Sequence, residues 1–248
     1  MTDNSKILSL TTIFAALYVI VSLLPGIPVI GGKGKIEIAA FLPPLYGVFL
    51  GPLNGFVASW LGALLAWLLP PGTPKPWGLA LTSASAFAAL ISGLSTKQRI
   101  GKIGGWVISS LIILLLLFLW YLSPVGRIAY WYPIPHWIAF FMTLTGGKWA
   151  FSLLKNSKYI PLALLLVGYP GIMTDHMVGN LLFIYLGKYL LGLGMEPSKM
   201  ASLFLAVLPI SILERGCMTV LLVMFGTPLI YGLIKAGLIE NFTKNFMF

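Results

Sequence analysis

Eight predominantly hydrophobic stretches, each bounded by Gly, Pro or Lys, make up most of this chain. They cover residues 8–29, 36–50, 53–69, 77–95, 105–122, 136–154, 159–193 and 199–234. A helix needs about 20 apolar residues to cross a bilayer, and fewer where other helices enclose it. The pattern therefore predicts an all-α, polytopic integral membrane protein whose helices pack into a bundle.

The charge content excludes the soluble alternatives. Charged residues make up 9% of the 248 residues, whereas an average soluble domain has about 25%. So few charges cannot cover a water-exposed surface, which excludes a soluble enzyme, a nucleic-acid-binding domain and a disordered protein. The formal net charge of +10 comes mainly from Lys and Arg at the edges of the hydrophobic stretches, where they set orientation. The densest short cluster of basic residues, at residues 96–102, favours cytoplasmic N- and C-termini.

The last two stretches are too long for single spans. A continuous helix of 35 residues measures about 52 Å, against a hydrocarbon core of about 30 Å. Because 159–193 contains a Gly-Tyr-Pro-Gly sequence at 168–171 and 199–234 contains Pro209, we expect breaks or half-helices there. Elsewhere small residues recur at helical spacing, as at Gly47, Gly51 and Gly55, with Pro52 interrupting the row between two helices. Such rows predict close internal packing, or a docking face for a partner membrane subunit.

Three acidic residues lie at or within the hydrophobic stretches, where ionisable groups are costly and tend to mark sites. Glu37 follows a Gly-rich basic turn that contains Lys33 and Lys35. This turn either folds over a ligand or is a flexible outer loop. Asp175 precedes His176, and His176 shares a helical face with Asn180, four residues later. This polar face predicts ligand binding, a proton relay or an internal hydrogen-bonded cluster.

Glu214 and Arg215 form the second polar patch. Adjacent side chains do not face each other on a helix, so we expect each to pair with a different partner. Arg215 is expected to meet Asp175 or a ligand carboxylate. Trp60 and Trp67, seven residues apart on one face, either line a pocket for a flat ring or pack internally.

Enzymatic chemistry finds little support in the sequence. There is no GxSxG or HExxH motif, and the two histidines, His136 and His176, lie in separate stretches. With a single cysteine, Cys217, no thiolate cluster is available for zinc. We therefore predict no catalytic residues, no metal site and no cofactor.

The order of several motifs resembles a known family. These motifs are the helix opening at 11–18, Gly31-Gly32, the stretch 42–55 with its Gly-x-x-x-Gly-Pro-x-x-Gly turn, 175–180, 209–215 and 223–230. Together they resemble the substrate-binding S component of energy-coupling factor (ECF) transporters. The resemblance implies a six-helix membrane protein that captures a vitamin or similar micronutrient from outside and hydrolyses nothing. It also implies a transmembrane T component and cytoplasmic ATPases as partners.

The resemblance also implies roles for segments and residues. The core would comprise 8–95 and 159–235, with 105–154 as an inserted helical hairpin in a single membrane domain. The loop that covers the ligand would contain Lys33, Lys35 and Glu37. The polar contacts to the ligand would come from Asp175, His176, Asn180, Glu214 and Arg215. Ala15 and Ala16 would dock on the T component, although Val19 and Ile20 replace the second alanine of the family's Ala-x-x-x-Ala pair.

Two other functions remain open from the residues alone. A stand-alone secondary transporter could use Asp175 and Glu214 as proton-coupling carboxylates, although no internal repeat is visible between the halves of the chain. An intramembrane enzyme acting on lipid could use Asp175 and His176 as acid–base groups, but no nucleophile accompanies them.

Overall fold

Helices make up nearly all of the computed structural model, which describes residues 3–28, 35–36, 38–69, 75–97, 99–192 and 194–236. The helices are α1 (Asp3–Ser22), α2 (Leu42–Leu68), α3 (Pro76–Thr96), α4 (Gly105–Leu122), α5 (Pro124–Ile128), α6 (Ile134–Leu154), α7 (Ile160–Leu191) and α8 (Pro197–Lys235). Short 3-10 helices, η1 (Ile38–Phe41) and η2 (Ser157–Tyr159), precede α2 and α7. Two-residue strands β1 (Ile27–Pro28) and β2 (Lys35–Ile36) pair antiparallel. The prediction of an all-α bundle is confirmed.

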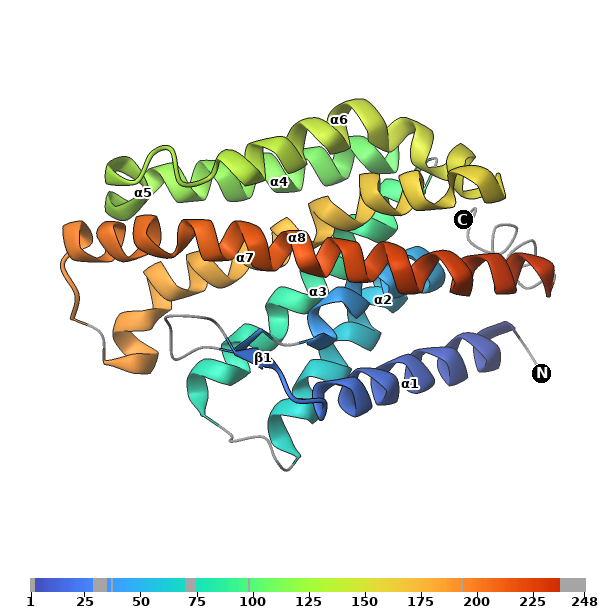
Figure 1. Cartoon of the computed structure of the whole chain (residues 1–248), viewed down its shortest axis with the longest axis horizontal. Coiled ribbons are helices and arrows are strands. Elements are labelled where there is room, and N and C mark those ends of the chain that lie inside the picture. Colours follow the sequence, from blue (N-terminus) through green and yellow to red (C-terminus); the bar gives the residue numbers. More distant parts are fainter. Residues whose placement is uncertain are drawn as a thin grey trace.

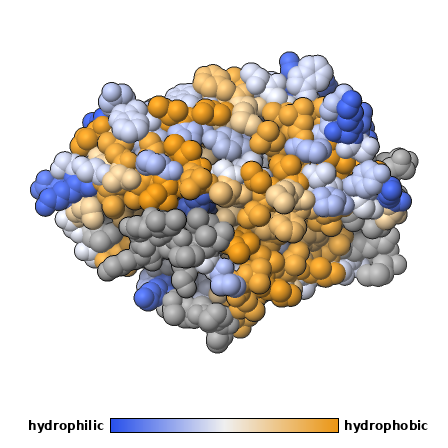
Figure 2. Space-filling model, viewed as in Figure 1, coloured by the Kyte–Doolittle hydropathy of each residue, from blue (hydrophilic) through white to orange (hydrophobic). Residues whose placement is uncertain are grey.

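Helices α1, α4, α6 and α8 run roughly along the long axis of the molecule (Figure 1). The α4–α6 pair lies on one side, α1 on the other, and α2 and α3 occupy the middle; α1 begins at the end where α8 finishes. Within the described residues, five helices are long and apolar enough to cross a membrane: Ile38–Leu68, Pro76–Thr96, Gly105–Leu122, Ser157–Gly187 and Pro197–Gly232. Figure 2 shows a mostly hydrophobic face between more hydrophilic ends, as a multi-pass membrane protein requires.

Helix α2 is a pair of arms that fold back on each other. Gly51 has φ 79°, which a residue with a side chain rarely adopts, and Pro52 follows it. A Cβ atom on Gly55 would lie only 2.7 Å from the Cα of Gly47, so the two arms touch through their backbones. The predicted interruption at Pro52 is therefore confirmed.

The small residues of α2 also bring α3 into backbone contact. A Cβ on Gly47 would collide with the carbonyl oxygen of Ala89, and one on Gly93 would lie 2.7 Å from the Cα of Pro52. Only glycine permits this approach, which increases the number of dispersion contacts between the helices. The predicted internal packing of this glycine row is confirmed.

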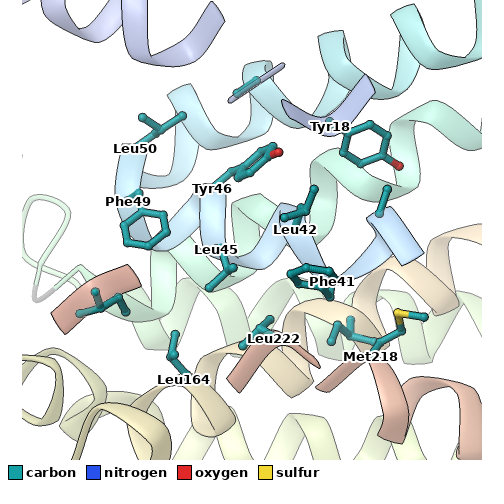
Figure 3. Packing of buried hydrophobic residues seen from close by; sticks show 14 of the residues in the cluster. Tyr18, Phe41, Leu42, Leu45, Tyr46, Phe49, Leu50, Leu164, Met218 and Leu222 are labelled. Atoms are coloured by element: carbon teal, nitrogen blue, oxygen red, sulfur yellow. The ribbon is translucent and has the colours of Figure 1, made fainter. Parts of the chain in front are cut away.

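The largest apolar cluster joins the N-terminal and C-terminal helices. Figure 3 shows Leu45 and Tyr46 of α2 among side chains that include Leu164 of α7 and Leu222 of α8. All four side chains are at most 2% exposed. This cluster fixes α7 and α8 against α2, and thereby fixes the polar residues that α7 and α8 carry.

The predicted breaks in the last two hydrophobic stretches are wrong. Helix α7 runs unbroken through Pro170, and the 39-residue α8 runs through Pro209 and Pro228. Neighbouring helices can support backbone that proline perturbs. Here Ser92 of α3 donates its hydroxyl to the carbonyl of Val167, three residues before Pro170, at 2.8 Å. At 1.5 Å per residue α8 is about 58 Å long, so it extends beyond the hydrocarbon core or crosses it at a tilt.

Candidate functional site

Polar side chains from α6, α7, α8 and the loop before α6 gather where these elements meet. We call them the polar cluster: Tyr132, His136, Asp175, His176, Asn180, Glu214 and Arg215. Five of the seven were predicted as ligand contacts from the sequence. Because α7 and α8 are both membrane-spanning helices by length and composition, these groups lie among apolar surroundings.

An arginine between two carboxylates forms the charged part of the cluster. Arg215 Nη1 lies 3.5 Å from Asp175 Oδ2, and Arg215 Nη2 lies 3.6 Å from Glu214 Oε1. The three side chains are only 15%, 21% and 20% exposed, respectively. The predicted approach of Arg215 to Asp175 is confirmed.

The expectation that Glu214 and Arg215 pair with different partners is wrong. Successive residues point about 100° apart around a helix, but the guanidinium stands on a long flexible stem and reaches back to its neighbour. Both contacts are longer than the 2.7–2.9 Å of a strong charge-assisted hydrogen bond. The guanidinium is therefore held loosely between two anions, and its Nε has no hydrogen-bond partner within the part of the chain that the structure describes.

Tyr132 connects the polar residues of α7 to an aromatic group. Asn180 Nδ2 donates to Tyr132 Oη at 3.2 Å, and the same oxygen lies 3.4 Å from His176 Nε2. The predicted shared face of His176 and Asn180 is confirmed by these two contacts. The Tyr132 ring stacks on Trp120 at 4.8 Å between centroids and meets Phe204 edge-on at 5.2 Å.

His136 was not expected in this site. It is 2% exposed, and its ring stacks on that of His176 with centroids 5.3 Å apart and planes within 17°. The sequence separates the two histidines by 40 residues, so only the packing of α6 on α7 reveals their contact. Within the described residues, no three His, Cys, Asp or Glu side chains are grouped as metal ligands.

The two predicted tryptophans occupy different surroundings on α2. Trp60 is 41% exposed, whereas the Trp67 indole donates to the carbonyl of Lys75 at 3.0 Å. Trp67 also packs against Gly78 at the start of α3. Trp67 therefore ties α2 to the segment that enters α3.

The remaining predicted residues lie in the loop after α1 and on α1 itself. Lys33 and Glu37 fall outside the described residues, and of Lys35 only the backbone, in β2, is described. Ala15 is 4% exposed and packs near Gly62 of α2, whereas Ala16 is exposed. A partner that approached the outer face of α1 would thus meet Ala16.

Comparison with known proteins assigns the chain to a family. A relative from Methanocaldococcus jannaschii, the uncharacterized protein MJ0923, is 29% identical over 194 residues, or 77% of this chain. Those residues span 60% of that relative's length. No solved structure gives a significant match. Residues 3–148, more than half of the chain, match the family described as the ECF-type riboflavin transporter, S component. The chain therefore belongs to this family of substrate-binding membrane subunits of transporters, which are not enzymes.

Proposed function

We propose that the chain is the substrate-binding subunit of an ATP-driven importer, and that it captures riboflavin or a vitamin with a similar flat polar ring. The observation that carries this proposal is a guanidinium and two carboxylates that are mostly buried among apolar helices. Charged groups at membrane depth are expensive and are typically retained at solute pathways. The description of the matching family supports a flavin as the solute.

The chemistry of the polar cluster suits such a solute. The riboflavin ring system has apolar faces and carries carbonyl oxygens and an N–H group along one edge. Arg215 offers donors to carbonyl oxygens, and Asp175 and Glu214 offer acceptors to an N–H group. Because the contacts of Arg215 are 3.5 and 3.6 Å long, a ligand can replace one of them at small cost. Few polar groups among apolar and aromatic walls are typical of small-molecule sites.

The rest of the assembly follows from the family. We propose that a T component and cytoplasmic ATPases supply the energy, and that Ala16 on the exposed face of α1 contributes to docking. The basic residues around 97–102 support a cytoplasmic location for the N- and C-termini. The loop that contains Lys33, Lys35 and Glu37 would then lie outside and cover the captured solute, with 105–154 as a hairpin added to the transport core.

Fluorescence titration tests ligand binding directly. Riboflavin fluoresces in water and loses intensity when its ring stacks on aromatic side chains, so purified protein in detergent should quench it saturably. Arg215→Gln and Asp175→Asn should each weaken binding about tenfold or more, since each removes a polar contact worth at least about 1.4 kcal/mol. Arg127→Gln and Glu196→Gln are matched controls, because both side chains are exposed outside the polar cluster and should leave affinity unchanged.

Two outcomes would refute the proposal. Mass spectrometry of small molecules that co-purify with the protein should identify a flavin or a related vitamin, and absence of both saturable quenching and any such molecule contradicts it. Alternatively, liposomes that contain this protein alone could accumulate solute and lose it when a protonophore collapses the proton gradient. That result would favour the secondary transporter in which Asp175 and Glu214 carry protons.

A further inference from the structure

A small cavity lies between α4, α6 and α7, next to His136 of the polar cluster. The volume open to the centre of a water molecule is about 10 Å³. Most of its lining is apolar, including Leu117, Met173 and Met177, and its polar lining comes from His136 and Thr174. A space of this size holds one water molecule and has no room for a second.

His136 has an unmet need for hydrogen bonds at this cavity. A neutral imidazole carries one N–H donor and one acceptor nitrogen, and burial of either without a partner is destabilising. The side chain is 2% exposed, and neither Nδ1 nor Nε2 has a hydrogen-bond partner among the described residues. Buried polar atoms without partners are rare in folded proteins and often mark the place of an ordered water.

Neighbouring side chains do not satisfy the His136 ring. His176 stacks with its plane within 17° of that of His136, so the two rings meet by their faces and not by their nitrogen-bearing edges. The Tyr132 ring centroid is 6.2 Å away, and its hydroxyl is already engaged by Asn180 and His176. The cavity is therefore the direction in which a partner for His136 can be accommodated.

Thr174 supplies the second polar contact that a trapped water needs. Its hydroxyl donates to the carbonyl of Pro170 at 2.8 Å, one turn earlier in α7. A hydroxyl that donates its hydrogen keeps lone pairs that can accept a hydrogen bond. A water molecule that donates to Thr174 retains a second hydrogen and its lone pairs for an imidazole nitrogen.

We propose that this cavity binds a single water molecule that bridges a ring nitrogen of His136 and the hydroxyl oxygen of Thr174. A cation does not fit the same lining, because no carboxylate of the described residues lines the cavity and an uncompensated charge in apolar surroundings is far more costly than a dipole. The bridge joins the start of α6 to the middle of α7. It also fixes the His136 ring against His176, whose Nε2 lies 3.4 Å from the Tyr132 hydroxyl.

The direction in which one substitution shifts Tm distinguishes a hydrated cavity from a dry one. In a dry cavity His136→Leu removes two unpaired polar atoms and should raise Tm in detergent. With the bridging water, the same change removes a hydrogen bond and strands the water, so Tm should fall by about 2–8 °C. A rise in Tm would overturn the proposal.

A double-mutant cycle tests the bridge between the two side chains. Thr174→Val should lower Tm less in the His136→Leu background than in the wild type, because the water that both residues hold is already lost. Met173→Leu is the matched control, since it changes an apolar wall of the same cavity with nearly conserved volume and should give additive effects. Additive effects of the His136 and Thr174 substitutions would contradict the bridge.

If the variants do not fold, a density map of the wild-type protein still tests the proposal. A density map of the wild-type protein at a resolution that shows ordered water should contain one peak within hydrogen-bonding distance of a His136 ring nitrogen and Thr174 Oγ1. An empty cavity in such a map, or one closed by neighbouring side chains, would overturn the proposal.

Discussion

Neutralising Asp175 alone should destabilise the protein more than neutralising Asp175 and Arg215 together. At the observed separation of 3.5 Å and an effective dielectric constant of about 20, the Coulomb attraction is about 5 kcal/mol, before the cost of desolvation. Removing one partner of a buried pair costs about 3–5 kcal/mol because the other charge is left unpaired. Asp175 is 21% exposed and Glu214 stays close to Arg215, so we expect about 2–3 kcal/mol for Asp175→Asn.

Arg215→Gln should be the worse single change, at about 3–4 kcal/mol, because it leaves two carboxylates without their shared cation. The double variant leaves only Glu214 charged, and its loss should be about 1–2 kcal/mol. The two single variants together should lose about 5–7 kcal/mol of unfolding free energy, whereas the double variant should lose only about 1–2 kcal/mol. The difference, about 3–6 kcal/mol, is the coupling free energy between Asp175 and Arg215. Reversible thermal unfolding in one detergent measures the loss of unfolding free energy for each single variant and for the double variant, with a Tm change of about 2–4 °C per kcal/mol.

Glu214→Gln provides the control for this cycle. It leaves the contact between Arg215 and Asp175 in place, so its cost should be the smallest of the three single changes. Losses that add to within about 0.5 kcal/mol for Asp175 and Arg215 would show that the two side chains do not interact in the folded protein. Such additivity would refute the electrostatic reasoning for the site.

Other substitutions test the packing and the hydrogen bonds around the site. Gly47→Ala should destabilise by about 3 kcal/mol or more because its Cβ collides with the Ala89 carbonyl, whereas Gly216→Ala meets open space and should be nearly neutral in thermal unfolding. Gly51→Ala should cost about 1–3 kcal/mol in the same assay, since φ 79° combined with ψ 176° is essentially confined to glycine. Tyr132→Phe should keep the aromatic stacking but remove the hydroxyl that two polar side chains contact. We therefore expect a loss of about 1–3 kcal/mol of stability and weaker ligand binding. Unchanged affinity would place Tyr132 outside the binding site.

Features that depend on local sequence were predictable. The stretch 105–122 coincides with α4, and 77–95 lies within α3 (Pro76–Thr96), because apolar runs and their Gly and Pro boundaries act over a few residues. The fold of α2 at Pro52 was predictable for the same reason. The continuity of α7 through Pro170 was not, since the packing of neighbouring helices decides whether a proline breaks a helix; Ser92 of α3, which bonds to the carbonyl of Val167, lies 75 positions earlier in the chain.

The residues of the candidate site also divide into those that could be predicted from the sequence and those that only the packing of the helices brings in. The approach of Arg215 to Asp175 could be predicted because a cation at membrane depth needs a nearby anion, and few acids are available. Tyr132 and His136 could not be predicted as members, because their contacts require that α6 and the loop before it pack against a particular turn of α7. The tyrosine lies 44 residues from the histidine that it meets, and no local pattern encodes that separation.

Different contacts hold the two parts of the bundle together. Helices α2 and α3 touch through glycine backbones, an arrangement with little room to move. Helices α7 and α8 pack through apolar residues of the shared core and through an ion pair, Asp175 with Arg215 at 3.5 Å, which is longer than a strong charge-assisted hydrogen bond. Apolar residues of similar size often stabilise a protein as well as a mostly buried ion pair does. Stability therefore does not explain why a chain with 9% charged residues keeps three of them here, and we propose that exchange of Arg215 between its carboxylates and an incoming solute does.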